Sequence, residues 1–146
     1  MKKIAVFFLM FILGMHVAYG GSVVTKNPKR LPLNARQFLN RFFVNEKISF
    51  IRIDCEFVKG TTYDVRLMNG MQVVFNHHGE WRGIRCKQGF IPVAVLPERI
   101  SGYLAEYCGD LPVTRIDRTR NQYGLVLNNE INLTFDPTGK LRELQR

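Results

Sequence analysis

The stretch YDVRLMNGMQVVFNHHGEW, residues 63–81, decides the fold of this chain. Apolar and polar residues alternate on both sides of Asn69-Gly70, as they do in strands that are buried on one side only. An Asn-Gly pair between two such runs favours a type I′ hairpin, in which both central residues have positive φ. We therefore expect an antiparallel hairpin centred on this pair.

The same pattern returns as YGLVLNNEINLTFDPTGKL, residues 123–141. Both copies contain a loop that ends in glycine, NHHG at 76–79 and DPTG at 136–139. Asn or Asp at the first place and Gly at the fourth are typical of a type I turn that closes on a left-handed glycine. A pattern that is kept at apolar and turn positions indicates that one structural unit occurs twice.

Each copy follows a predicted amphipathic helix that opens with Leu-Pro. Apolar residues recur with helical spacing from Leu31 and again from Leu96, so both helices should pack one stripe against a core. We predict an α+β fold made of two tandem repeats, 31–86 and 91–146. Each repeat is a helix followed by a four-stranded antiparallel meander. Together they would form one sheet of roughly eight strands, with the helices on one face and the other face open to water.

The first twenty residues, 1–20, have the composition of an export signal: two lysines, an apolar run, and small residues at the end. A membrane anchor is the alternative, but the run is shorter than the roughly 20 apolar residues that a bilayer needs. We expect a cleaved signal peptide, an N-terminal linker at 21–30 and a single domain at 31–146. The mature protein is then expected to be periplasmic or secreted, without a stable membrane span.

Net charge favours acidic partners. Loss of Lys2 and Lys3 with the signal lowers the formal charge from +9 to +7, and such a surplus attracts anionic surfaces over long range. The basic residues are scattered along the chain rather than interleaved with exposed aromatics. We therefore expect no nucleic-acid partner.

Three cysteines, Cys55, Cys86 and Cys108, follow the predicted signal. An oxidising compartment allows one disulfide with one thiol left over, and the sequence leaves the pairing open. Cys55 and Phe57 are in phase with the apolar residues of their strand, so Cys55 is expected to be a small buried side chain.

Residues for catalysis or metal binding are sparse. His77 and His78 are the histidines that follow the signal, and they lie in a predicted turn without a Ser or Cys nucleophile beside them. A zinc or copper site needs three or four ligands, and Asn76 and Glu80 complete one poorly. The acids Asp54, Glu56 and Asp64 lie on the polar face of the first sheet half and are expected to form cross-strand ion pairs. We predict no catalytic residue, no metal site and no cofactor.

The strand residues that point away from the helices are the candidate binding surface. They combine guanidinium, amide, carboxylate and small apolar groups, a composition that suits protein interfaces. The predicted partner-binding residues are Arg52, Arg66, Gln72, Val74, Arg82, Asp117, Val126, Asn132, Thr134 and Arg142.

These motifs resemble a known family. The export signal, the Leu-Pro helix starts, the YDVRL strand with its Asn-Gly turn at 63–70, the Phe-Asn-x-x-Gly-x-Trp segment at 75–81 and the degenerate second copy are similar to those of small exported bacterial proteins. These proteins form the PepSY-like, beta-lactamase-inhibitor-protein-like group. The resemblance implies two α/β repeats in one curved sheet. It also implies binding to proteins, since PepSY domains are associated with restraining peptidases and the inhibitors bind an enzyme across the concave sheet.

The leading hypothesis is an exported, non-enzymatic protein-binding module, such as an inhibitor or regulator of an envelope or secreted hydrolase. The alternative is a charge-driven binder of anionic envelope polymers without a defined protein target. A third hypothesis is a small hydrolase that uses His77 or His78. The sequence leaves the identity of the target and the oligomeric state open.

Overall fold

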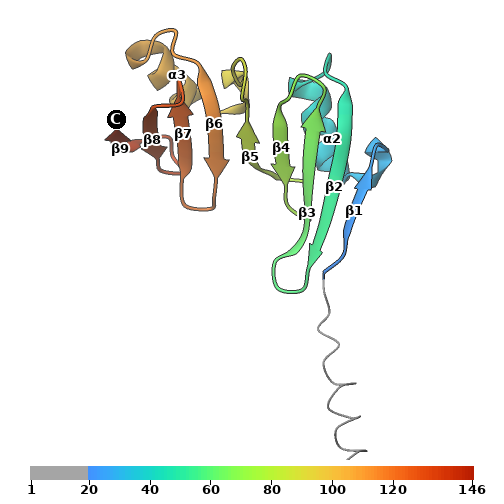
Figure 1. Cartoon of the computed structure of the whole chain (residues 1–146). Helices are drawn as coiled ribbons and strands as arrows, with labels where there is room; N and C mark the ends of the chain where they lie inside the picture. The colour runs from blue at the N-terminus through green and yellow to red at the C-terminus, as the bar shows by residue number, and fades with distance from the viewer. Residues whose placement is uncertain (1–19) are drawn as a thin grey trace, which may run out of the picture.

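A computed structural model describes residues 20–146 (Figure 1). The predicted signal peptide, 1–20, lies outside the described residues apart from Gly20. In chain order the elements are β1 (Ser22–Thr25), η1 (Pro28–Arg30), α2 (Leu33–Phe42), β2 (Ile48–Glu56), β3 (Gly60–Leu67), β4 (Gln72–Phe75), β5 (Trp81–Arg85), η2 (Val93–Val95), α3 (Glu98–Tyr107), β6 (Val113–Arg118), β7 (Tyr123–Leu127), β8 (Ile131–Phe135) and β9 (Leu141–Gln145). None of the helices between residues 20 and 146 has the length and apolar composition needed to cross a membrane.

The strands of the described part form one open antiparallel sheet of nine strands, in which each strand pairs with the next along the chain. An antiparallel sheet was predicted, but with roughly eight strands. The additional strand is β1, which lies in the segment 21–30 that we expected to be a linker and pairs with β2 from Ser22↔Asp54 to Thr25↔Ile51. Its side chains are mostly exposed, so it has no apolar alternation for a sequence pattern to detect.

The core lies between the two helices and one face of the sheet (Figure 1). Helix α2 buries Ala35 and Leu39, and α3 buries Ile100 and Leu104. The strands contribute their alternate residues to the same core: Ile51, Val65, Val73, Phe75, Ile84, Ile116, Leu125, Leu133 and Phe135. Since strand side chains alternate between faces, the residues between them point to the open face.

Equivalent aromatic pairs join each helix to the sheet. The ring of Phe38 in α2 lies 5.7 Å from that of Phe75 at an interplanar angle of 80°. The ring of Tyr103 in α3 lies 5.4 Å from that of Phe135 at 76°. Both are edge-to-face contacts, a favourable arrangement for aromatic rings. Each of the two helices therefore packs on the sheet through an equivalent aromatic contact.

The glycine-terminated loops have the predicted turn geometry. Gly79 donates its N–H to Asn76 at 3.0 Å, and Gly139 donates to Asp136 at 3.0 Å; both glycines have positive φ, 80° and 86°. Next to each loop the strand register shifts, between Val74 and Phe75 in one copy and between Thr134 and Phe135 in the other, as it does at a β-bulge. Gly79 also lies against the start of α2, because a β-carbon there would stand 2.9 Å from the Ala35 nitrogen.

The predicted type I′ turn at Asn69-Gly70 is wrong. Gly70 has a φ of 86°, whereas Asn69 is not among the residues with positive φ. The Gly70 N–H bonds to the Leu67 carbonyl at 3.0 Å and the Leu67 N–H to the Met71 carbonyl at 2.9 Å, so the loop comprises residues 68–70 rather than the two residues of a type I′ hairpin. The Asn69 side chain accepts the Met71 N–H at 2.9 Å. The asparagine pair of the second half instead has positive φ at both positions, 50° at Asn128 and 60° at Asn129.

The outer part of the β2–β3 hairpin is exposed, contrary to its apolar pattern. Cys55 is exposed, and Phe57 exposes 94% of its surface. Figure 1 shows the reason: this hairpin extends beyond the end of the helix layer, so its inward side has nothing to pack against. The expectation that Cys55 is buried is therefore wrong.

All three cysteines fall within the described residues, and all are free thiols. Cys86 is buried and donates its Sγ–H to the Gln88 carbonyl at 3.1 Å. Cys108 is half-buried, and burial raises the pKa of its thiol. The single disulfide that an oxidising compartment allows is not formed in this structure.

Candidate functional site on the open face of the sheet

Two rows of residues cross the open face, one from β2 to β8 and the other from β3 to β8, with one residue from each strand that the row crosses. We call the first the aspartate row; it runs through successive register partners Arg52, Asp64, Val74, Gly83, Asp117, Gly124 and Thr134. We call the second the arginine row; it runs through Arg66, Gln72, Arg85, Arg115, Val126 and Asn132. Both carboxylates of these rows, Asp64 and Asp117, lie in the aspartate row, whereas Arg66, Arg85 and Arg115 lie in the arginine row; Arg52 is the cation of the aspartate row.

Most of the predicted binding residues lie in these rows. Arg52, Val74, Asp117 and Thr134 belong to the aspartate row, and Arg66, Gln72, Val126 and Asn132 belong to the arginine row. Arg82 and Arg142 do not, because the bulge at the start of their strands interrupts the alternation. Arg82 instead pairs with Glu80 at 3.1 Å and Arg142 with Asp136 at 3.4 Å, both at the end of the sheet.

Asp64 organises one half of the open face. Its side chain is only 9% exposed, and its Oδ2 accepts hydrogen bonds from Gln72 Nε2 at 2.9 Å and Arg52 Nη2 at 3.3 Å. Its Oδ1 lies 3.4 Å from Arg66 Nε. Arg52 also bonds Asp54 at 3.0 Å. Charge-assisted hydrogen bonds of this kind fix long side chains in place, so this part of the face is preorganised.

Two arginines that the sequence analysis missed lie at the centre of the arginine row. Arg85 of β5 and Arg115 of β6 are direct register partners. Arg115 Nε donates to Asp117 Oδ2 at 2.6 Å, whereas no carboxylate of the described residues lies within ion-pair distance of Arg85. Alternation from Ile84 and Ile116 could have placed both side chains on the open face, but not opposite each other.

A basic hollow opens beside this pair. It has a volume of about 380 Å³, and no carboxylate of residues 20–146 lines it. We call it the arginine hollow; its polar lining residues are Arg66, Gln72, Arg85, Lys87, Thr114, Arg115 and Asn129. The Thr114 hydroxyl donates to the Val126 carbonyl at 3.2 Å and accepts the Asn129 N–H at 3.3 Å, which joins the wall of the hollow to the β7–β8 turn.

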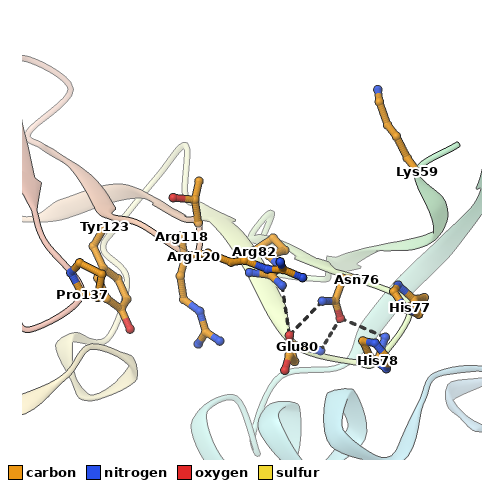
Figure 2. A pocket seen from close by; sticks show the side chains of 11 residues that line it. Lys59, Asn76, His77, His78, Glu80, Arg82, Arg118, Arg120, Tyr123 and Pro137 are labelled. Carbon is orange, nitrogen blue, oxygen red and sulfur yellow. Dashed lines mark hydrogen bonds and ion pairs between the residues drawn. The ribbon is translucent and has the colours of Figure 1, made fainter.

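A larger cleft of about 730 Å³ lies at the opposite end of the sheet, among the turns (Figure 2). Two of its charged groups, Glu80 and Arg82, form an ion pair with each other. Glu80 accepts hydrogen bonds from Asn76 Nδ2 at 3.0 Å and Arg82 Nη2 at 3.1 Å, as the dashed lines show. The Asn76 bond is the main cause that lowers the pKa of Glu80, and the charge of Arg82 lowers it further. Arg118 stacks on the Trp81 ring, 4.8 Å from its centre.

The histidines of this cleft have no Ser or Cys beside them in its described lining. Their rings stack on each other with centres 3.8 Å apart. The Thr119 hydroxyl accepts the Asn121 and Gln122 N–H groups of its own loop, both at 3.2 Å. Nowhere among residues 20–146 do three His, Cys, Asp or Glu side chains gather in a way that could hold a metal ion.

The fold and its charged face define the class of this protein: a one-sided antiparallel sheet, covered by two helices, whose other face is open and preorganised. The family described as "Putative beta-lactamase-inhibitor-like, PepSY-like" matches residues 61–143. The chain belongs to this PepSY-like family, which agrees with the resemblance seen in the sequence.

Solved structures from Bacteroides have the same fold. One, described as a "putative periplasmic protein of unknown function" from Bacteroides vulgatus ATCC 8482, is 33% identical with a TM-score of 0.79; the match covers 86% of this chain and 100% of that chain. A "putative calcium-regulated periplasmic protein" from Bacteroides thetaiotaomicron is 27% identical with a TM-score of 0.79, covering 86% of this chain and 97% of that one. No protein with a curated description matches the sequence.

Proposed function

We propose that this protein is an exported, non-enzymatic module that binds another protein through the open face of its sheet. One observation carries the proposal: eight of the residues predicted from sequence fall into the two ordered rows on the uncovered face. The helices bury the apolar face, so the open face is not needed to close the core. A fixed polar surface with small apolar contacts, such as Val74 and Val126, suits a protein interface.

The proposed location is the periplasm. The signal-like composition of residues 1–20 and the description of the similar Bacteroides structures as periplasmic proteins both support it. We also propose that the domain consists of two tandem units, each a helix with four strands. The matching Phe38–Phe75 and Tyr103–Phe135 contacts support this division.

The proposed target is an envelope or secreted hydrolase, which the module inhibits or regulates. The support is the inhibitor-like description of the family. One similar structure is described as calcium-regulated, but we do not extend calcium to this chain. Its neighbouring carboxylates, Asp54 and Asp64, are already bonded to Arg52, which leaves them poorly suited to a cation.

A comparison of two matched variants tests the role of the open face. Val74→Glu with Val126→Glu adds two charges to this face, where both side chains are half-buried. The control, Leu33→Glu with Val93→Glu, adds the same charges at exposed positions of the helix layer. The immobilised proteins are used to capture partners from periplasmic and secreted fractions, with quantitative mass spectrometry as the readout. We expect the wild type and the control to retain a shared partner and the open-face variant to lose it; equal recovery by all three would reject the proposal.

The arginine row and the net charge of +7 expected after loss of the signal favour one alternative, a charge-driven binder of anionic envelope polymers. The dependence of binding on salt concentration distinguishes this alternative from the proposed protein interface. Polymer binding by charge alone falls steeply as ionic strength rises, whereas a packed protein interface weakens modestly. Capture repeated at low and high salt therefore decides between them.

A further inference from the structure

Arg85 and Arg115 form an unfavourable pair within the protein itself. They lie directly opposite each other on adjacent antiparallel strands, where β-carbons are about 5 Å apart. Like charges in this position destabilise a sheet. Arg66 and Lys87 line the same hollow and add to the positive charge. The fold thus holds four cations around one hollow that contains no carboxylate.

The guanidinium groups of the hollow keep unused donors. Arg115 bonds Asp117 through Nε, which leaves its terminal N–H groups without a hydrogen-bond partner among the described residues. Arg85 makes no side-chain hydrogen bond there, and Arg66 Nε is buried without one, although it lies 3.4 Å from Asp64 Oδ1. A guanidinium presents a planar fork of donors that matches a carboxylate. The free donors of Arg85 and the terminal N–H groups of Arg115 are therefore available to a ligand, whereas Arg66 Nε is buried against Asp64.

The hollow is also held in position before a ligand arrives. Gln72, between Arg66 and Arg85 in the row, is fixed by its hydrogen bond to Asp64. Thr114 ties the far wall to the β7–β8 turn. Preorganised donors lower the entropic cost of binding.

We propose that the arginine hollow binds the carboxylates of a short acidic segment of the partner protein, with Arg85 and Arg115 as the principal contacts. This inference rests on the proposed function, because it names the chemistry of the partner. The negative charge of the segment would relieve the repulsion between the two arginines. No described carboxylate of this chain lies close enough to Arg85 to do so. Gln72 and Asn129, which also line the hollow, supply amides for the backbone of the segment.

The carboxylates of the neighbouring aspartate row favour a short acidic segment over a long polyanion as the ligand. Asp64 and Asp117 lie in the aspartate row, two residues along their strands from Arg66 and Arg115 of the hollow. Glu143 continues that row as the register partner of Thr134. A polymer that carried negative charge along its length would meet these carboxylates when it left the hollow. A segment with two or three acidic side chains, neutral on either side, would not.

A labelled acidic peptide, GSDEDSG, and its amide analogue, GSNQNSG, test the proposal with the purified full chain by fluorescence anisotropy. We expect the wild type to bind the acidic peptide and not the analogue. Arg85→Gln and Arg115→Gln should each weaken binding about tenfold, as expected for the loss of a charged hydrogen-bond partner. Lys26→Gln with Lys29→Gln removes charge at exposed positions outside the hollow and should change binding less than twofold.

Thermal unfolding provides a second readout that does not need the peptide. At low salt we expect Arg85→Gln to unfold at a higher temperature than the wild type, since the like-charge pair is removed, and high salt to reduce the difference. Arg85→Lys keeps the charge but loses the fork, so it should remain as stable as the wild type while binding less tightly. A variant that lost binding because it was misfolded would unfold at a lower temperature.

Three other outcomes would overturn the proposal that the arginine hollow binds an acidic segment. Acidic-peptide binding that is unchanged in Arg85→Gln and Arg115→Gln places the site elsewhere. Tighter binding of a long polyphosphate, lost in the same variants, assigns the hollow to anionic polymers. If the Val74→Glu, Val126→Glu variant loses the captured partner while Arg85→Gln retains it, the proposed function stands and only this inference fails.

Discussion

Gly79 and Ala35 lie so close that a β-carbon on Gly79 would stand 2.9 Å from the Ala35 backbone nitrogen. The contact joins the β4–β5 turn to the first turn of α2, and Asn34 Nδ2 strengthens it by donating to the His78 carbonyl at 3.2 Å. Gly79 thus meets two demands, a positive φ and a close approach of backbone to backbone. The orientation of α2 over the sheet depends on this contact.

The first prediction separates those two demands. Gly70→Ala alters a glycine that also has positive φ but has nothing within 4 Å of the added carbon, so it should cost about 1–2 kcal/mol. Gly79→Ala should cost about 1–3 kcal/mol more, because the fixed backbone of α2 must move. Urea unfolding measures both; equal losses would mean that the close approach contributes nothing.

The second prediction concerns acid stability. The Thr138 hydroxyl, 2.6 Å from Asp136 Oδ1, and the Lys140 N–H lower the pKa of Asp136 to about 2 from the ordinary 3.8. Because the pKa is lower in the folded state, the stabilisation is complete well above pH 3.8 and disappears as the pH falls toward 2. The difference in unfolding free energy between the wild type and Asp136→Asn should shrink over this interval. Asp110→Asn, at an exposed position, serves as the control; a difference that did not vary with pH would contradict the assignment.

The third prediction concerns Asp64. Asp64→Asn leaves Arg52 and Arg66 without their shared carboxylate and places an amide against the Gln72 amide. We expect a loss of about 2–3 kcal/mol. Asp54→Asn, which removes a more exposed partner of the same arginine, should cost less than about 1 kcal/mol. Chemical denaturation tests both, and similar losses would show that Asp64 does not organise the face.

The fourth prediction concerns thiol reactivity. Cys55 is exposed, Cys108 is half-buried with a raised pKa, and Cys86 is buried with its Sγ–H bonded to Gln88. Since the accessible thiolate is the reactive form, a maleimide should modify the native protein first at Cys55, then at Cys108 and last at Cys86. Peptide mapping after timed labelling gives the order. Early labelling of Cys86 would mean that the β5 end opens readily.

Local patterns predicted much of the fold. Period-two alternation around residues 63–81 and 123–141, helical spacing after Leu31 and Leu96, and the glycine-terminated turns identified the helices, the antiparallel sheet and its open face. The rules are local: the direction of a side chain from a strand or helix depends on residues a few positions away. Eight of the ten candidate residues lie in the two rows of the open face, and their role in binding stays a prediction.

The predictions of burial, strand number and turn type failed where contacts outside the local sequence pattern decided the structure. Cys55 and Phe57 follow the apolar phase but extend past the helix layer, and β1 shows no alternation because little of it is buried. At Asn69-Gly70 the pairing of Leu67 with Met71 closes a loop one residue longer than a type I′ hairpin has, and the residue pair alone does not reveal that pairing.

The sequence by itself determined the family, the antiparallel α+β architecture and the side of the sheet that stays open, because these follow from residue spacing and composition. Only the tertiary structure decided that Arg85 and Arg115 lie opposite each other, and that Asp64 accepts hydrogen bonds from both Arg52 and Gln72. Those relationships depend on the register between strands, and register is settled by how the helices, bulges and turns pack together rather than by any one strand.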